Sequence, residues 1–347
     1  MSDEASWLAG LEENARTQLP PEVFEYVAQG SREGLTTAES TAAWRALRFR
    51  PRVLRDVTEV DLSVSLLGQR AAVPWGVAPT TLQRTVHPEG EVAMARATAA
   101  TGGVMVVSSN AGTPFAEVGA TGVRWWVQVY VPEDRALAEP LLAAAVEAGA
   151  SGVVLTVDTP VVATKYVAGS PVWELVDPEA LRVNFAPDYA TLPGSEKARD
   201  LGPEDLAWLA DRTGLPVVAK GVLHPDDALR CVDAGAAAVW VSNHGGRQLD
   251  RGLATAVALA DVVDAVQGRA EVYVDGGIRS GLDILSALAL GADAAFLGRL
   301  PLYSLVDGAE GVSRMHAELT AQVSEALILA GCRTPAEAGG LAHDGPI

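Results

Sequence analysis

The sequence contains few of the residues that build disulfide or metal scaffolds. Its 347 residues include two cysteines, Cys231 and Cys332, with no CxxC spacing, which argues against a disulfide framework and against a zinc site. Basic residues are also scarce, because 26 Lys and Arg stand against 44 Asp and Glu and the formal net charge is −18. This acidity argues against nucleic acid and anionic membranes as partners.

Long hydrophobic runs are also lacking. No stretch reaches the roughly 18 apolar residues that a membrane span needs. Residues 1–5 lack the basic and apolar regions of a signal peptide. We therefore expect a cytoplasmic protein without a membrane partner. Because the chain is acidic overall, we expect an anionic substrate to require a local cluster of Arg and Lys.

From about residue 72 onwards, short apolar runs alternate with amphipathic stretches. The runs are nearly continuous in hydrophobicity, which is typical of strands buried on both faces of a parallel sheet. Glycines such as Gly102 and Gly235 fall where a helix would end before the next strand. Eight strand–helix units predict an α/β protein with a closed (β/α)8 TIM barrel. The predicted strands cover 74–80, 103–109, 125–131, 152–158, 216–222, 238–244, 271–277 and 294–299.

Two segments interrupt this alternation. Residues 1–71 include expected helices over 7–18 and 21–29 and a connection over 48–67, and we interpret them as an N-terminal helical cap. Residues 159–203 follow the fourth predicted strand and show little periodicity. A connection of that length is usually an active-site lid or a disordered insert, and its place on the catalytic face of the barrel favours a long lid loop. Residues 72–347 would form the barrel, with the whole chain as one domain.

Polar residues stand at the end of every predicted strand. In a (β/α)8 barrel the active site lies at these C-terminal ends. A buried polar group without a partner costs about 1–3 kcal/mol, so we expect a polar ligand to fill the barrel mouth. The residues are Thr80, Thr81, Ser108, Ser109, Asn110, Gln128, Tyr130, Thr156, Asp158, Lys220, Ser242, Asn243, His244, Asp275, Gly276, Gly277, Gly298 and Arg299.

The seventh and eighth predicted strands lead into glycines and arginines. The segments Asp275–Arg279 and Gly298–Arg299 lie where barrels commonly bind phosphate. Glycine lets backbone N–H groups approach a phosphate, and Arg binds it with two hydrogen bonds. Each motif alone is also compatible with a structural turn, and their joint occurrence favours the phosphate site.

The sixth predicted strand ends in the string SNHGGRQLD over residues 242–250. His244 supplies an imidazole, and the reference pKa of histidine, about 6.5, suits proton removal at neutral pH. The glycine pair allows a sharp turn that would let His244 and Arg247 face one ligand. Arg247 would bind a carboxylate while His244 reaches the neighbouring hydroxyl. The alternative, a core His with a satisfied ring, does not explain the strand-end position and the Arg.

At this point the chain resembles the family of FMN-dependent 2-hydroxy-acid oxidases and dehydrogenases, which includes glycolate oxidase, lactate oxidase and mandelate dehydrogenase. The resemblance runs from about residue 19 to 333. The motifs that carry it are RFRPRVLRDV (48–57), VAPTTLQRTVHPEGE (77–91), VQVYVPEDR (127–135), LTVDTP (155–160), KGV (220–222), SNHGGRQLD (242–250), DGGIRSGLDILSALALGADAAFLGR (275–299) and LAGCRT (329–334).

The resemblance implies FMN as cofactor, no metal, and a specific role for each matching residue. His244 would take the hydroxyl proton, with Asp158 stabilising the imidazolium. Arg247 and Tyr26 would hold the substrate carboxylate, and Tyr130 a substrate oxygen. Lys220 would balance the charge of the reduced flavin. The other implied FMN contacts are Ala78, Thr80, Thr81, Ser108, Gln128, Thr156, Ser242, Asp275, Gly276, Gly277, Arg279, Gly298 and Arg299.

Three positions depart from the family pattern, and they concern the substrate more than the cofactor. Lys165 stands where an Arg usually helps bind the carboxylate, and Lys lacks the planar fork of Arg. Thr81 stands where Ala or Gly is common, and Asn110 where glycolate oxidases have a Trp. We assign Lys165 and Asn110 to substrate binding. The altered pocket predicts a substrate other than glycolate or lactate.

Several alternatives remain open at this stage. The substrate could be a 2-amino acid or a biosynthetic intermediate, and the chain could be a non-catalytic flavin-binding protein. Isopentenyl-diphosphate isomerases and inosine-phosphate dehydrogenases are similar in their phosphate loops but not in SNHGGRQ. We expect oxygen as the electron acceptor, and the resemblance implies a homotetramer or octamer.

Overall fold

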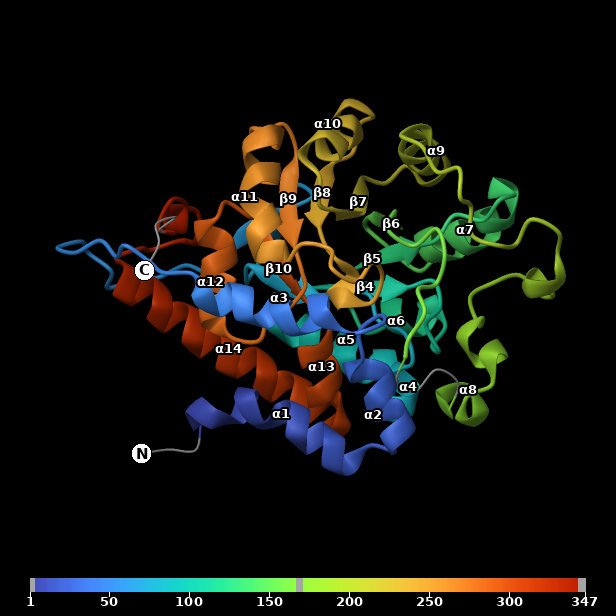
Figure 1. The fold of residues 1–347 in the computed structure, drawn as a ribbon, viewed down its shortest axis with the longest axis horizontal. Coiled ribbons are helices and arrows are strands. Elements are labelled where there is room, and N and C mark those ends of the chain that lie inside the picture. The colour runs from blue at the N-terminus through green and yellow to red at the C-terminus, as the bar shows by residue number, and fades with distance from the viewer. Residues whose placement is uncertain (1–3, 167–170, 343–347) are drawn as a thin grey trace.

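The computed structural model describes residues 4–166 and 171–342, and its centre is a closed barrel of eight parallel strands (Figure 1). This confirms the predicted TIM barrel. Most predicted strands ran two or three residues too far at the C-terminal end, because the polar residues there already belong to loops. The strands are β3 (Trp75–Val77), β4 (Val104–Ser108), β5 (Arg124–Val129), β6 (Val153–Thr156), β7 (Val217–Val222), β8 (Ala238–Val241), β9 (Glu271–Val274) and β10 (Ala294–Leu297).

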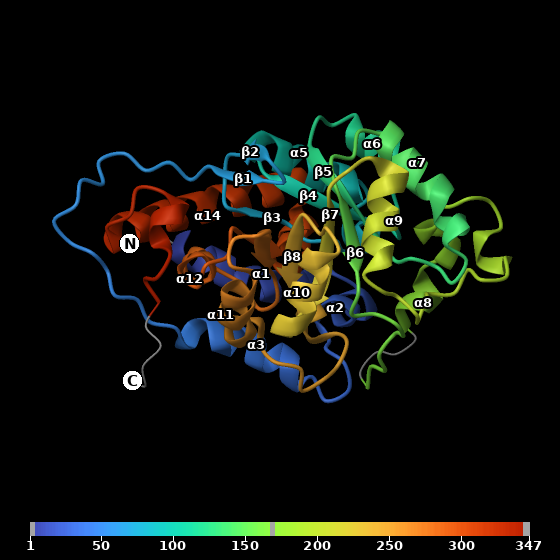
Figure 2. The same ribbon diagram turned by 90° about the horizontal axis from the view of Figure 1, so that it is seen from above.

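Helices surround the barrel and return the chain to the start of each next strand (Figures 1 and 2). Side-chain caps fix where some of them begin: His224 accepts from the backbone N–H of Asp226 at the start of α10, and Ser280 from that of Asp283 at α12. The helices are α4 (Gln83–Val86), α5 (Gly90–Thr101), α6 (Phe115–Gly119), α7 (Glu139–Glu147), α9 (Glu204–Thr213), α10 (Pro225–Asp233), α11 (Thr255–Val266), α12 (Gly281–Ala289), α13 (Arg299–Ser304) and α14 (Gly308–Ala330).

Side chains inside the barrel form an apolar layer below a polar one. The apolar layer contains four aromatic side chains that pack against one another, Trp126, Trp240, Tyr273 and Phe296. Because side chains of a strand alternate between its two faces, the residue two positions after an inward aromatic also points inward. Those residues are Gln128, Ser242 and Asp275. The same alternation that fills the core therefore places polar groups at the mouth.

A short hairpin, which was not predicted from the sequence, closes the opposite end of the barrel. Its strands are β1 (Val64–Leu66) and β2 (Gln69–Ala71). Leu66 and Ala71 are fully buried against the interior of the barrel, and the backbone N–H of Leu67 donates to the Glu271 carboxylate at 3.0 Å. Residues 64–71 therefore seal the N-terminal face, so the cavity can open only at the other end.

The N-terminal segment forms α1 (Glu4–Gln18), α2 (Pro21–Ala28) and α3 (Leu35–Ala46). The helices expected over 7–18 and 21–29 are confirmed, while α3 was not predicted. The helix α1 packs against α13 and α14, and α2 packs against α13 and α8. The helix α3 packs on α11 and on the turn His244–Gly246. The indole N–H of Trp44, on α3, donates to the carbonyl of Gly276 at 2.7 Å, so this helix supports two loops of the mouth.

The long connection after β6 is more structured than its composition indicated. It contains α8 (Pro171–Leu175) and the 3₁₀ turns η2 (Pro178–Leu181) and η3 (Tyr189–Thr191). Trp173 of α8 meets Tyr26 of α2 edge to face, with ring centroids 5.7 Å apart. The connection therefore covers part of the mouth, as expected of a lid; its movement stays a prediction. No helix among residues 4–166 and 171–342 is both long and apolar enough to cross a membrane.

His316 is a buried histidine outside the barrel mouth. Its Nδ1 accepts from the Trp75 indole N–H at 3.2 Å, and its Nε2 lies 3.3 Å from the Thr98 hydroxyl. That hydroxyl already donates to the carbonyl of Met94, so His316 Nε2–H must be the donor to it. The neutral ring satisfies every partner, and burial lowers the pKa of His316 to about 4.

We expect His316 to make the protein less stable in mild acid. Its pKa is about 4 in the folded state, against a reference of 6.5, so its contribution is fully present above pH 6.5 and is lost as the pH falls toward 4. At about 1.36 kcal/mol per unit, the loss is about 3 kcal/mol. In His316→Gln the unfolding free energy, measured by denaturant titration, should change less steeply between these pH values. An unchanged slope would contradict this assignment.

Candidate active site

A cavity of about 400 Å³ opens at the C-terminal ends of the barrel strands. It collects residues from every strand loop, from α2 and from the long connection. All but two of the predicted site residues line it: Tyr26, Ala78, Thr80, Thr81, Ser108, Asn110, Gln128, Tyr130, Thr156, Lys165, Lys220, His244, Arg247, Asp275, Gly276, Gly277, Arg279, Gly298 and Arg299. The remaining two, Asp158 and Ser242, lie behind the lining and hydrogen-bond to residues in it.

His244 sits in a tight turn rather than on the strand. Strand β8 ends at Val241, and His244, Gly245 and Gly246 have φ values of +56°, +63° and +75°. A left-handed backbone is uncommon for a residue other than glycine and marks a strained position. The backbone N–H of His244 donates to the Ser242 hydroxyl at 3.1 Å, which holds the turn. A Cβ on Gly246 would lie 2.5 Å from the Thr37 backbone nitrogen, so α3 can pack here only against glycine.

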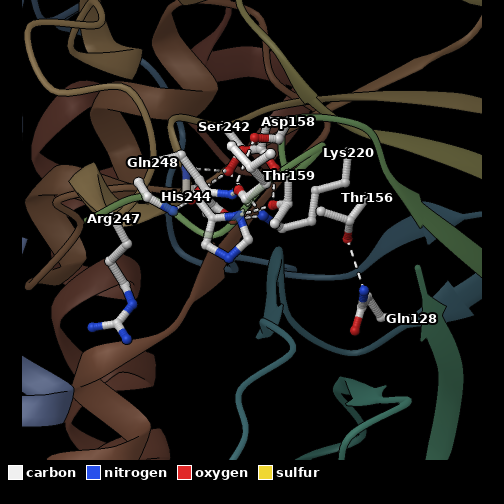
Figure 3. Close-up of polar contacts among 12 residues, drawn as sticks. Gln128, Thr156, Asp158, Thr159, Lys220, Ser242, His244, Arg247 and Gln248 are labelled. Carbon is white, nitrogen blue, oxygen red and sulfur yellow. Dashed lines mark hydrogen bonds and ion pairs between the residues drawn. The ribbon is translucent and has the colours of Figure 1, made fainter. Parts of the chain in front are cut away.

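His244 and Asp158 form a hydrogen-bonded pair (Figure 3). The distance from His244 Nδ1 to Asp158 Oδ1 is 3.0 Å, and the Thr159 hydroxyl donates to the same carboxylate at 3.1 Å. Burial opposes ionisation of Asp158, but the charge and hydrogen bond of His244, together with Lys220, hold its pKa below the ordinary value. Asp158 is therefore ionised, orients Nδ1–H of the ring, and leaves His244 Nε2 as the nitrogen that can accept a proton.

Lys220, Ser242 and Asp275 form a buried network at the floor of the cavity. Lys220 Nζ donates to the Ser242 hydroxyl at 2.8 Å and lies 3.0 Å from Asp275 Oδ2. Ser242 in turn donates to Asp275 Oδ1 at 2.6 Å. Since a buried charge is tolerated only when it is paired and hydrogen-bonded, this network explains how a lysine can lie within the barrel strand β7. It also fixes Ser242, which holds the His244 turn.

A second row of polar side chains crosses three neighbouring strands. Ser108 donates to Gln128 Oε1 at 3.1 Å, and Gln128 Nε2 donates to the Thr156 hydroxyl at 2.9 Å. Ser108 pairs with Gln128 in the β4–β5 register, and Thr156 pairs with Lys220 in the β6–β7 register. The parallel register therefore produces a flat edge of donors and acceptors. In Figure 3 the His244 ring lies between this edge and Arg247.

Three arginines gather on the other side of the cavity. Arg299 donates from all three guanidinium nitrogens, to the carbonyls of Val27, Gly245 and Gln29, at 2.8 to 2.9 Å. Burial, followed by the charges of Arg279 and Arg247, lowers the pKa of Arg299 to about 9. The described ion pairs around the cavity are Lys220–Asp275 and His244–Asp158, and none gives these arginines a carboxylate. The cluster is therefore suited to an anionic ligand.

The glycines of the β9 loop are required by local packing, and their contact with FMN stays a prediction. A Cβ on Gly276 would lie 2.7 Å from Asn243 Oδ1, and one on Gly277 would lie 2.5 Å from the Ser40 backbone. Both absent side chains would meet protein rather than the cavity. These glycines let the loop pack against the β8 turn and α3, which aligns Asp275 and Arg279 at the mouth.

Arg247 is held from one side only. Its Nη1 donates to the carbonyls of Tyr26 and Gln29, at 2.6 and 3.1 Å, and its guanidinium lies 4.8 Å above the Tyr26 ring. Its Nε and Nη2 make no hydrogen bond within the described part of the chain. A guanidinium held in this way offers its free edge to a carboxylate. Tyr26 and Arg247 are thus brought together as the sequence predicted.

The three departures from the family pattern all line the cavity. Lys165 Nζ donates to the carbonyls of Ala163 and Arg247 at 2.8 and 2.7 Å, so it braces the backbone of Arg247. Burial, then the charges of Arg247 and Lys197, lowers the pKa of Lys165 to about 8. Thr81 donates to the backbone carbonyl of Asn110 at 2.7 Å, so these two departures are coupled to each other.

Several cavity residues were not predicted from the sequence. They are Lys197, Trp173 and Leu181 from the long connection, and Thr159, Val162 and Gln248. Thr159 and Gln248 belong to motifs already singled out, LTVDTP and SNHGGRQLD, so the motif spacing could have found them. Lys197 carries no such signal, since only the folded connection brings it to the mouth. No group of three His, Cys, Asp or Glu suited to a metal ion occurs among the described residues.

Comparison with known proteins gives consistent matches over the whole barrel. The family described as FMN-dependent dehydrogenase matches residues 15–342. Glycolate oxidase 3 of Arabidopsis thaliana is 39% identical over 337 residues, covering 93% of this chain and 91% of that protein. The L-lactate oxidase of Nostoc sp. is 38% identical over 340 residues, covering 92% and 93%. The crystal structure of mandelate oxidase with (S)-4-hydroxymandelic acid superposes with a TM-score of 0.91 at 36% identity, covering 98% and 99% of the two chains.

We expect Gly221→Ala to displace Asp158. Gly221 has a φ of +113°, and a Cβ there would lie 2.7 Å from both Cβ and Cγ of Asp158. Gly235 also has a positive φ, +89°, but open space around it, so Gly235→Ala is the matched control. Placing alanine at a positive φ should lower the free energy of unfolding of either variant by about 1–2 kcal/mol. The loss should be larger in Gly221→Ala, because there the His244–Asp158 pair must also shift. Denaturant unfolding of both variants measures the difference; an equal loss would contradict the contact.

Proposed function

The chain belongs to the FMN-dependent dehydrogenase family, as an enzyme of 2-hydroxy-acid oxidation, and we propose that His244 is its catalytic base and Arg247 its carboxylate-binding residue. The observation that carries this proposal is the hydrogen bond of 3.0 Å between His244 and Asp158 at the cavity that Arg247 also lines. The base His244 and the carboxylate-binding Arg247 then face one substrate, and Asp158 orients His244 from behind the cavity lining.

The cavity residues fit FMN. The Ser108, Gln128 and Thr156 edge suits the carbonyl and N–H groups of an isoalloxazine, and Lys220 lies next to it across the β6–β7 register. Arg279 and Arg299 are cations without a described carboxylate partner, as a ligand phosphate requires. Bound FMN supplies the two-electron acceptor. We propose that Ala78, Thr80 and Thr81 also border the flavin, and that Asp275, Gly276, Gly277 and Gly298 border its ribityl phosphate chain.

The proton path follows from the hydrogen bonds of His244. Its Nδ1 is occupied by Asp158, so we assign the free Nε2 as the atom that takes the proton of the substrate hydroxyl. The ionised Asp158 stabilises the imidazolium that forms, since a carboxylate at hydrogen-bond distance favours the charged ring. The proton therefore stays on His244 while the substrate loses its α-hydrogen with two electrons.

Arg247, Tyr26 and Tyr130 orient the acid for this step. The free edge of the Arg247 guanidinium binds the carboxylate, and Tyr26 completes this end of the site. Burial, followed by the charge of Asp158, raises the pKa of Tyr130 above its usual value. Its phenol is thus neutral at any physiological pH and acts as a hydrogen-bond donor to a substrate oxygen.

The departures from the family pattern favour a substrate other than glycolate or lactate. The coupled Thr81 and Asn110 replace apolar groups by polar ones beside the substrate, and Lys165 braces Arg247 rather than offering a second planar clamp. A larger or more polar 2-hydroxy acid suits such a pocket. We propose oxygen as the electron acceptor, supported by relatives that are named oxidases. A tetrameric or octameric assembly stays a prediction from the family resemblance.

Replacing the base should separate cofactor binding from turnover. We expect His244→Gln to retain FMN and to lose turnover by about 10²- to 10⁴-fold, the usual contribution of a positioned base. The matched control is His224→Gln, an exposed histidine at the start of α10, which should keep both. Visible spectra and steady-state rates measure the two properties. Turnover in His244→Gln that equals the wild-type rate would remove the proposed base.

Substrate choice is tested by a panel of 2-hydroxy acids at one oxygen concentration. Glycolate and L-lactate should have kcat/KM values at least about ten-fold below the best acid of the panel, since pocket changes of this size discriminate by about 10- to 200-fold. Equal efficiency with either small acid would overturn the substrate proposal without affecting the assignment of His244.

A further inference from the structure

The whole sequence contains three lysines, Lys165, Lys197 and Lys220, and all three line the cavity. All the other residues counted as Lys or Arg are arginines. Lys220 is paired with Asp275, and Lys165 is bonded to two carbonyls. Neither the motifs nor the proposed reaction accounts for Lys197.

The backbone of Lys197 is fixed in place by the end of β5. Lys197 forms an antiparallel bridge with Pro132. On either side of it, the N–H of Ala198 donates to the carbonyl of Val131 at 2.9 Å, and the N–H of Glu133 donates to the carbonyl of Glu196 at 2.8 Å. The lysine therefore belongs to an ordered part of the connection and is held beside Tyr130.

The ammonium of Lys197 has no oxygen partner among the described residues. Its Nζ lies 3.5 Å from the centroid of the Tyr130 ring, an attractive but incomplete substitute for an anion. Burial lowers the pKa of Lys197 to about 8, and only the charge of Asp158 opposes this effect. Asp158 already serves His244 at 3.0 Å. The Lys197 ammonium is thus partly removed from water, and no anionic group is paired with it among the described residues.

Arg247 and Lys197 occupy different parts of the substrate pocket. Arg247 lies against Tyr26 of α2, and Lys197 lies against Tyr130 after β5. The charges of both lower the pKa of Lys165, after burial, so the three cations lie within electrostatic reach of one another. A carboxylate bound at Arg247 leaves Lys197 for another group. Asn110, whose amide nitrogen makes no hydrogen bond within the described residues, adds a donor to the same pocket.

The cavity as a whole carries more positive charge than FMN and one substrate carboxylate would neutralise. Its lining holds six Lys and Arg side chains and one acid, Asp275, which is paired with Lys220. A phosphate monoester and one carboxylate together supply about three negative charges. That leaves uncompensated positive charge in the mouth of a protein whose net charge is −18.

We propose that the substrate is a 2-hydroxy acid with a second anionic group, and that Lys197 binds this second group. The proposal rests on the function proposed above and narrows its substrate class to compounds such as 2-hydroxydicarboxylates. Arg247 and Tyr26 hold the carboxylate next to the reacting carbon, and the distal anion lies at Lys197, on the face of Tyr130.

The test compares acids that differ only in the distal group: malate against 2-hydroxybutanoate, and 2-hydroxyglutarate against 2-hydroxypentanoate, with both enantiomers of each. Wild-type kcat/KM should favour the diacid of each pair by at least about ten-fold. In Lys197→Met the diacid-to-monoacid ratio should fall by about ten- to a hundred-fold, the usual effect of losing a hydrogen bond to a charged group. Lys197→Arg keeps the charge and should keep the preference.

The matched control is Arg199→Met, which removes an exposed positive charge two residues along the same connection and should leave the ratio unchanged. Bound flavin in each variant, read from its visible spectrum, confirms that the cavity is intact. A wild-type preference for the monoacids, or a ratio that is the same in Lys197→Met as in the wild type, would overturn the proposal.

Binding of acids that cannot be oxidised tests the anion site at Lys197 separately from the proposed oxidation of 2-hydroxy acids. Butanedioate and butanoate cannot be oxidised as 2-hydroxy acids, and their binding is followed by perturbation of the flavin spectrum. Butanedioate should bind more tightly, and Lys197→Met should remove that advantage. If no 2-hydroxy acid reduces the flavin, the proposed function fails, while this binding difference still supports the anion site at Lys197. Equal binding of the two compounds to the wild type would overturn the site.

Discussion

The alternation of side chains along eight parallel strands in closed register is the constraint on which the site depends. It places Trp126, Trp240 and Tyr273 in the core and, two residues later, Gln128, Ser242 and Asp275 at the mouth. A shift of one residue in any strand would turn its polar group outward and its neighbour inward. The same strand register therefore fixes both the packing of the apolar core and the positions of the polar side chains at the cavity floor.

The second feature is a concentration of positive charge within an acidic protein. The three lysines of the chain and Arg247, Arg279 and Arg299 all line one cavity. Only Lys220 has a described carboxylate partner there, Asp275. Burial, and after it the charges of Arg279 and Arg247, lowers the pKa of Arg299, so the unpaired cations of the cavity cost free energy while no anion is bound. The site is thus prepared to gain stability when anionic ligands bind. This arrangement supports both the phosphate site and the two-anion substrate.

The barrel and most of its site could be predicted because their signals are local. Continuous apolar runs give the strands, and the polar residues that end them give the cavity lining. His244, Gly245 and Gly246 adopt the sharp turn that the glycine pair indicated. The pairing of His244 with Asp158 is the contact that the family resemblance implied. The division at residue 71 into a cap and a barrel stays a prediction.

The parts that escaped prediction depend on contacts between distant segments. The helix α3 lacks a strong apolar stripe, and its place is set by Trp44 and by the close approach of Thr37 to Gly246. The hairpin β1–β2 is recognisable only by the barrel end that it closes. Lys197 reaches the mouth through its bridge to Pro132. Nothing in the sequence indicated that the Lys165 ammonium would donate to the carbonyls of Ala163 and Arg247; its predicted contact with the substrate stays a prediction.

The most direct test of the central claim is an anaerobic reaction of the purified yellow protein with one 2-hydroxydicarboxylate, in ordinary form and with deuterium on the carbon that bears the hydroxyl. The flavin should bleach in a single reductive step, and deuterium should slow this step, because the bond from that carbon to hydrogen breaks while His244 takes the hydroxyl proton. A flavin that stays oxidised with this acid and with every other 2-hydroxy acid would show that the protein does not oxidise 2-hydroxy acids.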